Sequence, residues 1–294
     1  MTLPTLDSTV VAALELLARE STSLPSIPFT RPLVVGSGNA LETGRIIFKD
    51  VPATFASESK YEHALKVYQP DGAILISASG GKHSTHIAKT LTGQGVRTFL
   101  FTHTAHAPAA AVLHPSDVFV FPKLSEPYTY NVSTYFGLIA AAEPQDMSAL
   151  LADVRSARAA FPALGGYRAY TLVVPSQYSL IVPMLRTKLS ELFGSHVPAR
   201  VFAEEDLKHG KTTIHAEDEL YIICGGADDT ILYPESARIA VPLVGTGYLG
   251  ALATTYALVG ALQTEKPPYF ANNIERYVER ASAVFNQHIT PIVD

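Results

Sequence analysis

The chain has 294 residues, of which 47% are apolar and 17% are charged, so it can bury a large core and fits one large domain or two ordinary ones. Its formal net charge of −5 argues against general nucleic-acid binding, because such proteins need a basic face that displaces counterions. The single cysteine, Cys224, excludes an intramolecular disulfide framework and indicates a reducing compartment.

Apolar runs in this sequence are too short or too interrupted to span a bilayer. The first residues, MTLPTLD, lack the basic start of a signal peptide. We therefore expect a soluble, cytoplasmic protein with neither a membrane nor a nucleic-acid partner.

Strands and helices alternate along the first half of the chain. An alanine- and leucine-rich amphipathic helix is predicted over residues 8–20, and short apolar strands follow it, several of them separated by helical segments. The predicted strands are residues 31–35, 53–56, 73–77, 98–102 and 118–121. Continuous apolar strands that alternate with helices indicate a parallel sheet covered on both faces, where ligands bind beyond the carboxyl ends of the strands.

The order of predicted elements in the second half repeats that of the first. These elements are helices at residues 147–160, 180–193 and 249–262 and strands at residues 170–174, 200–203, 220–224 and 238–242. We infer an α/β fold of two similar doubly wound parallel-sheet domains, related by duplication. The expected division is a helix and linker at residues 1–29, a first domain at 30–145 and a second domain at 146–294.

One loop of the first half combines small hydroxyl residues with glycines between a strand and a helix. Gly80 and Gly81 let the backbone come close to a ligand, and free N–H groups at the start of the helix favour a negative charge. Hydroxyl donors come from Ser77, Ser79 and Thr85. The segment therefore favours a bound phosphate.

Lys82 supports this interpretation of the loop. A cation in the first turn of a helix opposes the macrodipole, at a cost of roughly several tenths of a kcal/mol, unless an anion lies between them. The alternative, from the segment alone, is an ordinary Ser/Gly turn with good helix-capping residues.

Several short motifs, taken in order, resemble a known family. SASG at residues 77–80, with Thr85, follows GSG at 36–38 and precedes QGVRTFLFT at 94–102, and this set resembles the sugar isomerase (SIS) domain. DLKHG at 206–210 resembles the ELKHG motif in the isomerase part of glucosamine-6-phosphate synthase, which has two SIS domains in one chain. The resemblance extends over most of the chain and implies two flavodoxin-like α-β-α sandwiches, as in related fructosamine-6-phosphate deglycases.

The resemblance implies a site for a sugar phosphate and requires neither a metal nor another cofactor. The residues that it assigns to phosphate and substrate binding are Gly38, Ser77, Ser79, Gly80, Lys82, Thr85, Ser133 and Thr134. Lys82 stands where the family commonly has threonine, so it can replace a neutral donor with a charged one.

Two catalytic residues are also implied by the resemblance. Glu191 resembles the glutamate that moves a proton between the first two carbons of the sugar, and His209 resembles the histidine that opens the ring. This chemistry needs a carboxylate whose pKa partial burial can raise, and a second acid–base group for the ring oxygen. The alternative, from the sequence pattern alone, is that Glu191 is a solvated residue on a helix and that His209 is a loop residue with local hydrogen bonds.

Asn272 falls at a position where the family has a lysine, so the sequence departs from that of the synthase here.

Two classes of function stay open. The first is an enzyme that isomerises an aldose phosphate to a ketose phosphate, or cleaves the amine from a fructosamine 6-phosphate. The second is a non-catalytic sensor that binds a phosphosugar. For the enzyme we expect a homodimer with a shared active site, because the matching histidine of the resembled synthase reaches across its dimer.

Two His-x-x-His pairs leave a metal site as a further alternative. The pairs are His83 with His86 and His103 with His106, and His103 follows a strand that should end beside the Ser77 loop. No cysteine or carboxylate completes the set in the sequence.

Overall fold

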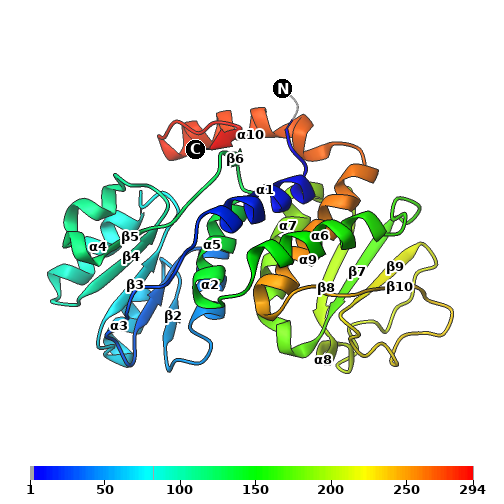
Figure 1. The fold of residues 1–294 in the computed structure, drawn as a ribbon, viewed down its shortest axis with the longest axis horizontal. Coiled ribbons are helices and arrows are strands. Elements are labelled where there is room, and N and C mark those ends of the chain that lie inside the picture. The colour runs from blue at the N-terminus through cyan, green and yellow to red at the C-terminus, as the bar shows by residue number, and fades with distance from the viewer. Residues whose placement is uncertain (1–2, 82, 294) are drawn as a thin grey trace. The chain divides into compact units, whose positions relative to one another are not determined.

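The computed structural model describes residues 3–81 and 83–293, and within them the chain forms two compact units (Figure 1). The Ser77 unit comprises residues 19–123 and 134–144. The Glu191 unit comprises the segment that ends at Ala18, residues 124–133 and the chain from Gln145 onward. A division near residue 145 was expected, whereas the first helix and residues 124–133 belong with the second sheet rather than the first.

The Ser77 unit is built on a parallel sheet with the strand order β2-β1-β3-β4-β5. Its strands are β1 (Leu33–Val35), β2 (Thr54–Ala56), β3 (Ala73–Ile76), β4 (Thr98–Thr102) and β5 (Val118–Val120). Its helices are α2 (Asn39–Ile47), α3 (Tyr61–Tyr68), α4 (His83–Gly93), the 3₁₀ turns η1 (Pro108–Val112) and η2 (Pro115–Asp117), and most of α5 (Val132–Ala142). This order is that of flavodoxin-like doubly wound folds.

The central strands of this sheet are buried along their whole length, which is why they appear in the sequence as continuous apolar runs. Gly44 allows α2 to approach the sheet closely, since a Cβ atom there would lie 2.7 Å from Cγ1 of Val34.

The Glu191 unit has its own parallel sheet, with the strand order β10-β9-β7-β8. Its strands are β7 (Ala169–Val174), β8 (Ala199–Ala203), β9 (Glu219–Cys224) and β10 (Ala237–Val241). Its helices are α1 (Leu6–Arg19), α6 (Met147–Ala160), the 3₁₀ segment η3 (Ser176–Ile181), α7 (Val182–Phe193), α8 (Glu204–Leu207), α9 (Gly247–Glu265) and α10 (Tyr269–Phe285). In Figure 1 these strands and α7, α9 and α6 lie together in the green-to-orange part of the chain.

Helix α9 is apolar on all sides and is the central helix of this unit. Gly260 lets α1 pack directly against it, because a Cβ atom at Gly260 would lie 2.1 Å from the backbone nitrogen of Asp7. Asp7 in turn forms a salt bridge of 2.5 Å with Arg158 of α6. These contacts explain why the first helix belongs to the second sheet.

The chain end forms a small structure of its own within the Glu191 unit. Strand β11 (Ile292–Val293) pairs with β6 (Glu126–Pro127) in antiparallel fashion, and the N–H group of Tyr128 donates to the carbonyl of Pro291 at 2.8 Å. The C-terminal segment therefore holds residues 126–128 by backbone hydrogen bonds.

The predicted α/β class with parallel sheets covered by helices is confirmed. The helix predicted over residues 180–193 divides into η3 and α7, with Pro183 in the first turn of α7, where its missing N–H group costs no hydrogen bond. Within residues 3–81 and 83–293, no helix is both long and apolar enough to cross a membrane.

Candidate functional site

The Ser77 loop lies at the point where the strand order of its sheet reverses. The chain moves from β1 outward to β2 and then returns to β3 on the other side of β1. Val35 of β1 is opposite Leu75 of β3, so the Gly36–Gly38 turn and the Ser77 loop leave neighbouring strands at the same edge. In doubly wound sheets, ligands bind at this switch point.

Hydroxyl groups shape the inside of the Ser77 loop. The side chain of Ser77 accepts hydrogen bonds from the N–H group of Gly80 at 3.2 Å and is 2.7 Å from the hydroxyl of Ser84. The N–H group of Gly81 points to the hydroxyl of Ser79 at 3.3 Å, and Ser79 is exposed. Ser77 therefore holds the loop in shape, whereas the side chain of Ser79 is exposed to solvent.

The segment after β4 fixes this loop from the neighbouring strand. The carbonyl of Ala78 accepts three hydrogen bonds, from the hydroxyls of Thr102 and Thr104 at 3.1 and 3.2 Å and from the N–H group of His103 at 3.0 Å. The carbonyl of Gly80 accepts from the N–H group of Ala109 at 2.8 Å. Such a loop is organised before a ligand arrives, which reduces the entropy lost on binding.

The remaining residues expected to bind substrate have different surroundings. Thr85, in the first turn of α4, reaches the carbonyl of Gly80 at 3.5 Å, and Gly38 is exposed with φ of 52° just before α2. Ser133 is fully buried, and its hydroxyl accepts from the N–H group of Leu124 at 3.0 Å. Thr134 is buried as well. Lys82 lies outside the described residues.

The ring of His103 is bonded to backbone carbonyl groups. Its Nδ1 lies 3.1 Å from the carbonyl oxygens of both Phe121 and Pro122, so this nitrogen carries the proton. Burial lowers the pKa of His103 to about 4, although both carbonyls favour the charged ring. Among residues 3–81 and 83–293, no three His, Cys, Asp or Glu side chains gather in a metal-binding group.

Glu191 lies in the last turn of α7, on the side that Lys188 shares. The side chain of Glu191 is 26% exposed, whereas Lys188 is completely buried. The ammonium of Lys188 donates to Oε2 of Glu191 at 2.7 Å and to the carbonyl of Thr129 at 2.5 Å. Burial raises the pKa of Glu191 above its ordinary value, although the charge and hydrogen bond of Lys188 oppose the increase.

Thr129 presents its carbonyl to Lys188 from an unusual backbone conformation. Its φ is +80°, a region that β-branched residues rarely adopt, and such outliers cost about 1–3 kcal/mol each. The contact with a buried ammonium, which needs acceptors, helps to offset this cost. Strain of this kind is typical of functional sites.

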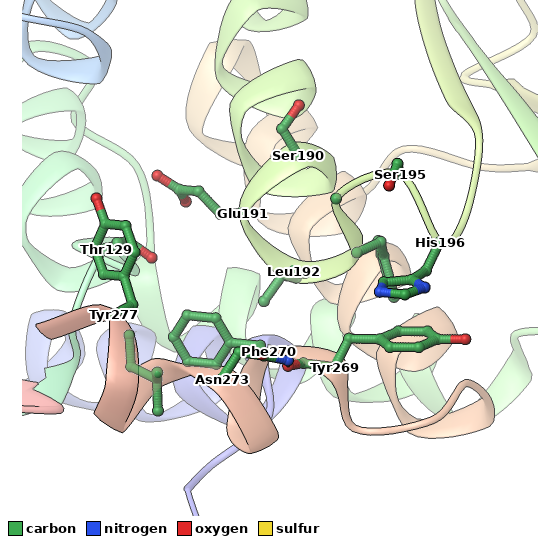
Figure 2. A pocket seen from close by; sticks show the side chains of 13 residues that line it. Thr129, Ser190, Glu191, Leu192, Ser195, His196, Tyr269, Phe270, Asn273 and Tyr277 are labelled. Atoms are coloured by element: carbon green, nitrogen blue, oxygen red, sulfur yellow. The ribbon is translucent and has the colours of Figure 1, made fainter. Parts of the chain in front are cut away.

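A cavity of about 460 Å³ opens beside Glu191 (Figure 2). Glu191 points toward Thr129 and Tyr277 at one end, and at the other end the ring of His196 is stacked on Tyr269, with centroids 4.4 Å apart. The full wall consists of Thr129, Ser190, Glu191, Leu192, Phe193, Gly194, Ser195, His196, Tyr269, Phe270, Asn273, Ile274 and Tyr277. A half-buried carboxylate thus meets a cavity of a size that suits a small ligand.

His209 and Asn272, which the family resemblance also singles out, do not line this cavity. His209 is exposed in the turn after α8, whereas the cavity wall is formed by Thr129, α7, residues 194–196 and α10. Asn272 is exposed on α10, and its neighbour Asn273 lines the cavity. Within this chain, the cavity therefore contains Glu191 without His209.

Sequence reasoning missed three features of the cavity. Lys188 precedes Glu191 by three positions, which places the two side chains together on a helix, and this spacing was a usable signal. Helix α10 was missed as well, although its buried residues Phe270, Ile274 and Val278 recur at helical spacing. The conformation of Thr129 had no sequence signal, since threonine does not favour positive φ.

Comparison with known proteins shows similarity of structure alone. No family model and no curated protein sequence matches the chain. Solved structures with a similar fold include a glucosamine-6-phosphate deaminase from Thermotoga maritima, which matches with a TM-score of 0.60 and 12% identity over 88% of this chain and 91% of that one. A tagatose-6-phosphate ketose/aldose isomerase from Escherichia coli matches with a TM-score of 0.58 and 13% identity over 88% of this chain and 86% of that one.

A protein assigned as sugar-binding, from Salmonella typhimurium LT2, has a TM-score of 0.58 and 14% identity over 90% of this chain and 94% of its own. The fold is one that phosphosugar isomerases have. At these identities, the activity of this chain has to be argued from its own residues.

Proposed function

We propose that this protein is an enzyme acting on a sugar phosphate, either isomerising an aldose to a ketose or cleaving the amine from a fructosamine 6-phosphate. The observation that carries the proposal is the placement of Glu191, a half-buried carboxylate at a cavity, paired with a buried lysine and with a raised pKa. A carboxylate with a raised pKa accepts a proton more readily than an ordinary one and can return it later in the reaction.

The proposed roles follow from the contacts. Lys188 engages Oε2 of Glu191 and so orients the carboxylate that would take the proton from the carbon next to the carbonyl group. Ser79, with the N–H groups at the start of α4, would hold a phosphate, because hydroxyls and the N–H groups of a helix start bind dianions without a cofactor. Thr85 and Gly38 would border the same ligand. His209 would open the sugar ring.

The role proposed for His209 requires a second copy of the chain. It is exposed and lies apart from the wall of the cavity within its own chain. We therefore propose a homodimer in which His209 of the partner subunit serves the Glu191 cavity. An exposed histidine is free to do so, whereas a buried one would have to leave its own packing.

Proton exchange with solvent tests the proposal directly. In heavy water, the enzyme should replace the C1 or C2 hydrogen of its substrate with deuterium, which NMR detects in a panel of hexose, pentose and fructosamine phosphates. Glu191→Gln should abolish the exchange while leaving phosphate-dependent binding nearly intact, because the amide keeps the shape but cannot accept the proton. Exchange at an unchanged rate in this variant would remove Glu191 from the mechanism.

Binding is tested separately by thermal stability. Phosphorylated sugars should stabilise the protein by about 2.7 kcal/mol at a hundredfold excess over the dissociation constant, and their unphosphorylated forms should not. An equal response to glucose and glucose 6-phosphate would contradict the assignment of the Ser77 loop to phosphate.

A non-catalytic phosphosugar sensor is the second candidate. It is favoured by the exposed positions of His209 and of Asn272, which falls where the resembled synthase has a lysine. If the wild-type protein binds phosphosugars but exchanges no proton and turns none over, the sensor is the better account, and Asn272 becomes the first residue to examine.

A further inference from the structure

The guanidinium group of Arg200, in β8, donates hydrogen bonds in two directions. Its Nε and Nη2 atoms lie 3.2 and 2.5 Å from Oε1 of Glu219, and Nε is also 3.0 Å from the hydroxyl of Thr171. Its Nη1 atom donates to the carbonyl of Lys211 at 3.1 Å. One side chain therefore connects the sheet of the Glu191 unit to the loop that follows α8, and this loop carries His209.

Glu219 holds the guanidinium group in one orientation. Its side chain is only 6% exposed, whereas that of Arg200 is 37% exposed. Oε1 of Glu219 also accepts a hydrogen bond from the hydroxyl of Thr171 at 2.5 Å, and Oε2 accepts one from the hydroxyl of Tyr221 at 3.3 Å. These residues lie on the adjacent strands β8, β7 and β9. The sheet therefore sets the direction in which Nη1 of Arg200 meets the loop.

The loop itself makes a tight turn directly after His209. Gly210 has φ of +72°, and its carbonyl accepts a hydrogen bond from the hydroxyl of Thr213 at 2.7 Å. The carbonyl of Thr213 accepts one from the hydroxyl of Tyr233 at 2.8 Å. The N–H group of His209 donates to the carbonyl of Asp206 at 3.1 Å. The backbone around His209 is thus held by hydrogen bonds, while its side chain is exposed.

We propose that Arg200 is a positioning residue for His209. Through the carbonyl of Lys211, two residues further along, it keeps the loop in the conformation from which His209 serves the ring oxygen of the substrate. A loop that is ordered before the substrate arrives loses less entropy on binding and places its acid–base group more accurately. The inference deepens the proposed function, on which its catalytic meaning rests.

A clasp that only joins the strands would need a different set of contacts. It would use those of Arg200 with Glu219 and Thr171, but not the one with Lys211. The two roles can be separated because arginine has five N–H donors in a fixed fork, whereas lysine has one ammonium group. Arg200→Lys should keep an ion pair with Glu219 and lose the hydrogen bond to the loop.

Amide hydrogen exchange tests the inference without any substrate. In Arg200→Lys, residues 208–214 should exchange about two- to tenfold faster than in the wild type, as expected for one lost hydrogen bond. Arg168→Lys is the matched control, since Arg168 forms an exposed ion pair with Asp218, beyond the measured segment. It should leave the exchange of residues 208–214 unchanged. An unchanged rate in Arg200→Lys as well would overturn the inference.

A double variant keeps the test decisive if Arg200→Lys does not fold. Arg200→Met together with Glu219→Gln removes both charges, so neither is left buried without a partner. The same increase in the exchange of residues 208–214 is expected. Wild-type exchange in the folded double variant would show that Arg200 does not hold the loop.

A second anchor of the same loop gives an independent comparison. Tyr233→Phe removes the hydrogen bond to Thr213 and leaves the ion pair of Arg200 untouched, so it should also speed the exchange of residues 208–214. Tyr248→Phe is its control, because it removes a similar bond of 2.7 Å to the carbonyl of Gln177, outside the loop. Tyr248→Phe should leave the loop as it is in the wild type.

Turnover separates a role in positioning His209 from a role in the fold alone. Arg200→Lys and Tyr233→Phe should slow the reaction of a ring-closed substrate by roughly tenfold or more. Both should retain nearly the wild-type rate with an analogue that lacks the ring-closing hydroxyl, since this analogue does not need its ring opened. Equal losses with the two substrates, or full turnover despite a loosened loop, would overturn the inference. A wild type without turnover contradicts the proposed function, whereas amide exchange still decides whether Arg200 holds the loop.

Discussion

Gly80 lies so close to Ala107 that a Cβ atom added to Gly80 would be 2.4 Å from the Cβ atom of Ala107. Gly80 also has φ of +58°, which L-residues with a side chain rarely adopt. Both the space and the backbone therefore require glycine at the turn of the Ser77 loop. Gly81, the next residue, has no such constraint, since its nearest neighbour would be the hydroxyl of Ser79 at 3.5 Å.

Gly80→Ala should therefore lower the free energy of unfolding by about 1–3 kcal/mol, because the loop must shift away from Ala107 and strain its backbone. Gly81→Ala should change it by less than about 0.5 kcal/mol. Urea denaturation of both variants measures the difference. Similar losses in the two variants would mean that the loop does not depend on the conformation of Gly80.

Glu191→Gln should change how stability depends on pH. A carboxyl group whose pKa is raised on folding contributes stability that is present below the pKa of the unfolded chain and is lost as the pH rises through the folded pKa. The wild type should therefore lose stability relative to Glu191→Gln as the pH increases above about 4.5. Urea denaturation at several pH values between 4 and 8 gives this difference. A constant difference would show that folding does not perturb Glu191.

His103 should determine part of the acid sensitivity of the Ser77 unit. Its pKa is lowered to about 4 by burial, so its contribution is fully present above pH 6.5 and is lost as the pH falls toward 4. The difference in pKa corresponds to about 3 kcal/mol at most. His103→Gln should therefore lose less stability between pH 7 and pH 4 than the wild type does.

His106→Gln is the matched control for this prediction, because His106 follows three residues later and is exposed. It should retain the acid sensitivity of the wild type. If both variants lose stability in parallel with the wild type, His103 is not the group that becomes protonated.

The sheets of this protein were predictable from sequence because buried strands are short apolar runs with glycine or polar ends. Thr98–Thr102 and Met147–Ala160 have the predicted bounds, and the other predicted strands differ by one or two residues, whereas the short strands β6 and β11 were not predicted. Helix α10 was not predicted, because residues 265–273 were interpreted through the family resemblance and the amphipathic repeat of the helix extends beyond them.

The parts of the candidate site that depend on local sequence were predictable. Hydroxyl and glycine residues after a strand indicate an anion loop by their chemistry, and a motif marks Glu191. The pairing of Lys188 with the Thr129 carbonyl, 59 positions away, depends on a loop with two non-glycine residues at positive φ. Local sequence patterns do not encode such long-range contacts, which tertiary structure alone brings together.

The last prediction concerns the shared active site. Glu191→Gln and His209→Ala should each inactivate the enzyme or slow it by about 10²–10⁴, since each removes a general acid–base group. If the two groups that serve one cavity come from different chains, a mixed dimer has one cavity with both groups intact and one with neither. Mixing the two inactive variants should then restore up to about a quarter of the wild-type activity at random exchange, because half of the dimers are mixed and each has one intact cavity. Subunit exchange is confirmed first with differently tagged chains. Exchange without any recovery would mean that each chain completes its own site, and that the loop carrying His209 has to reach the Glu191 cavity of the same chain.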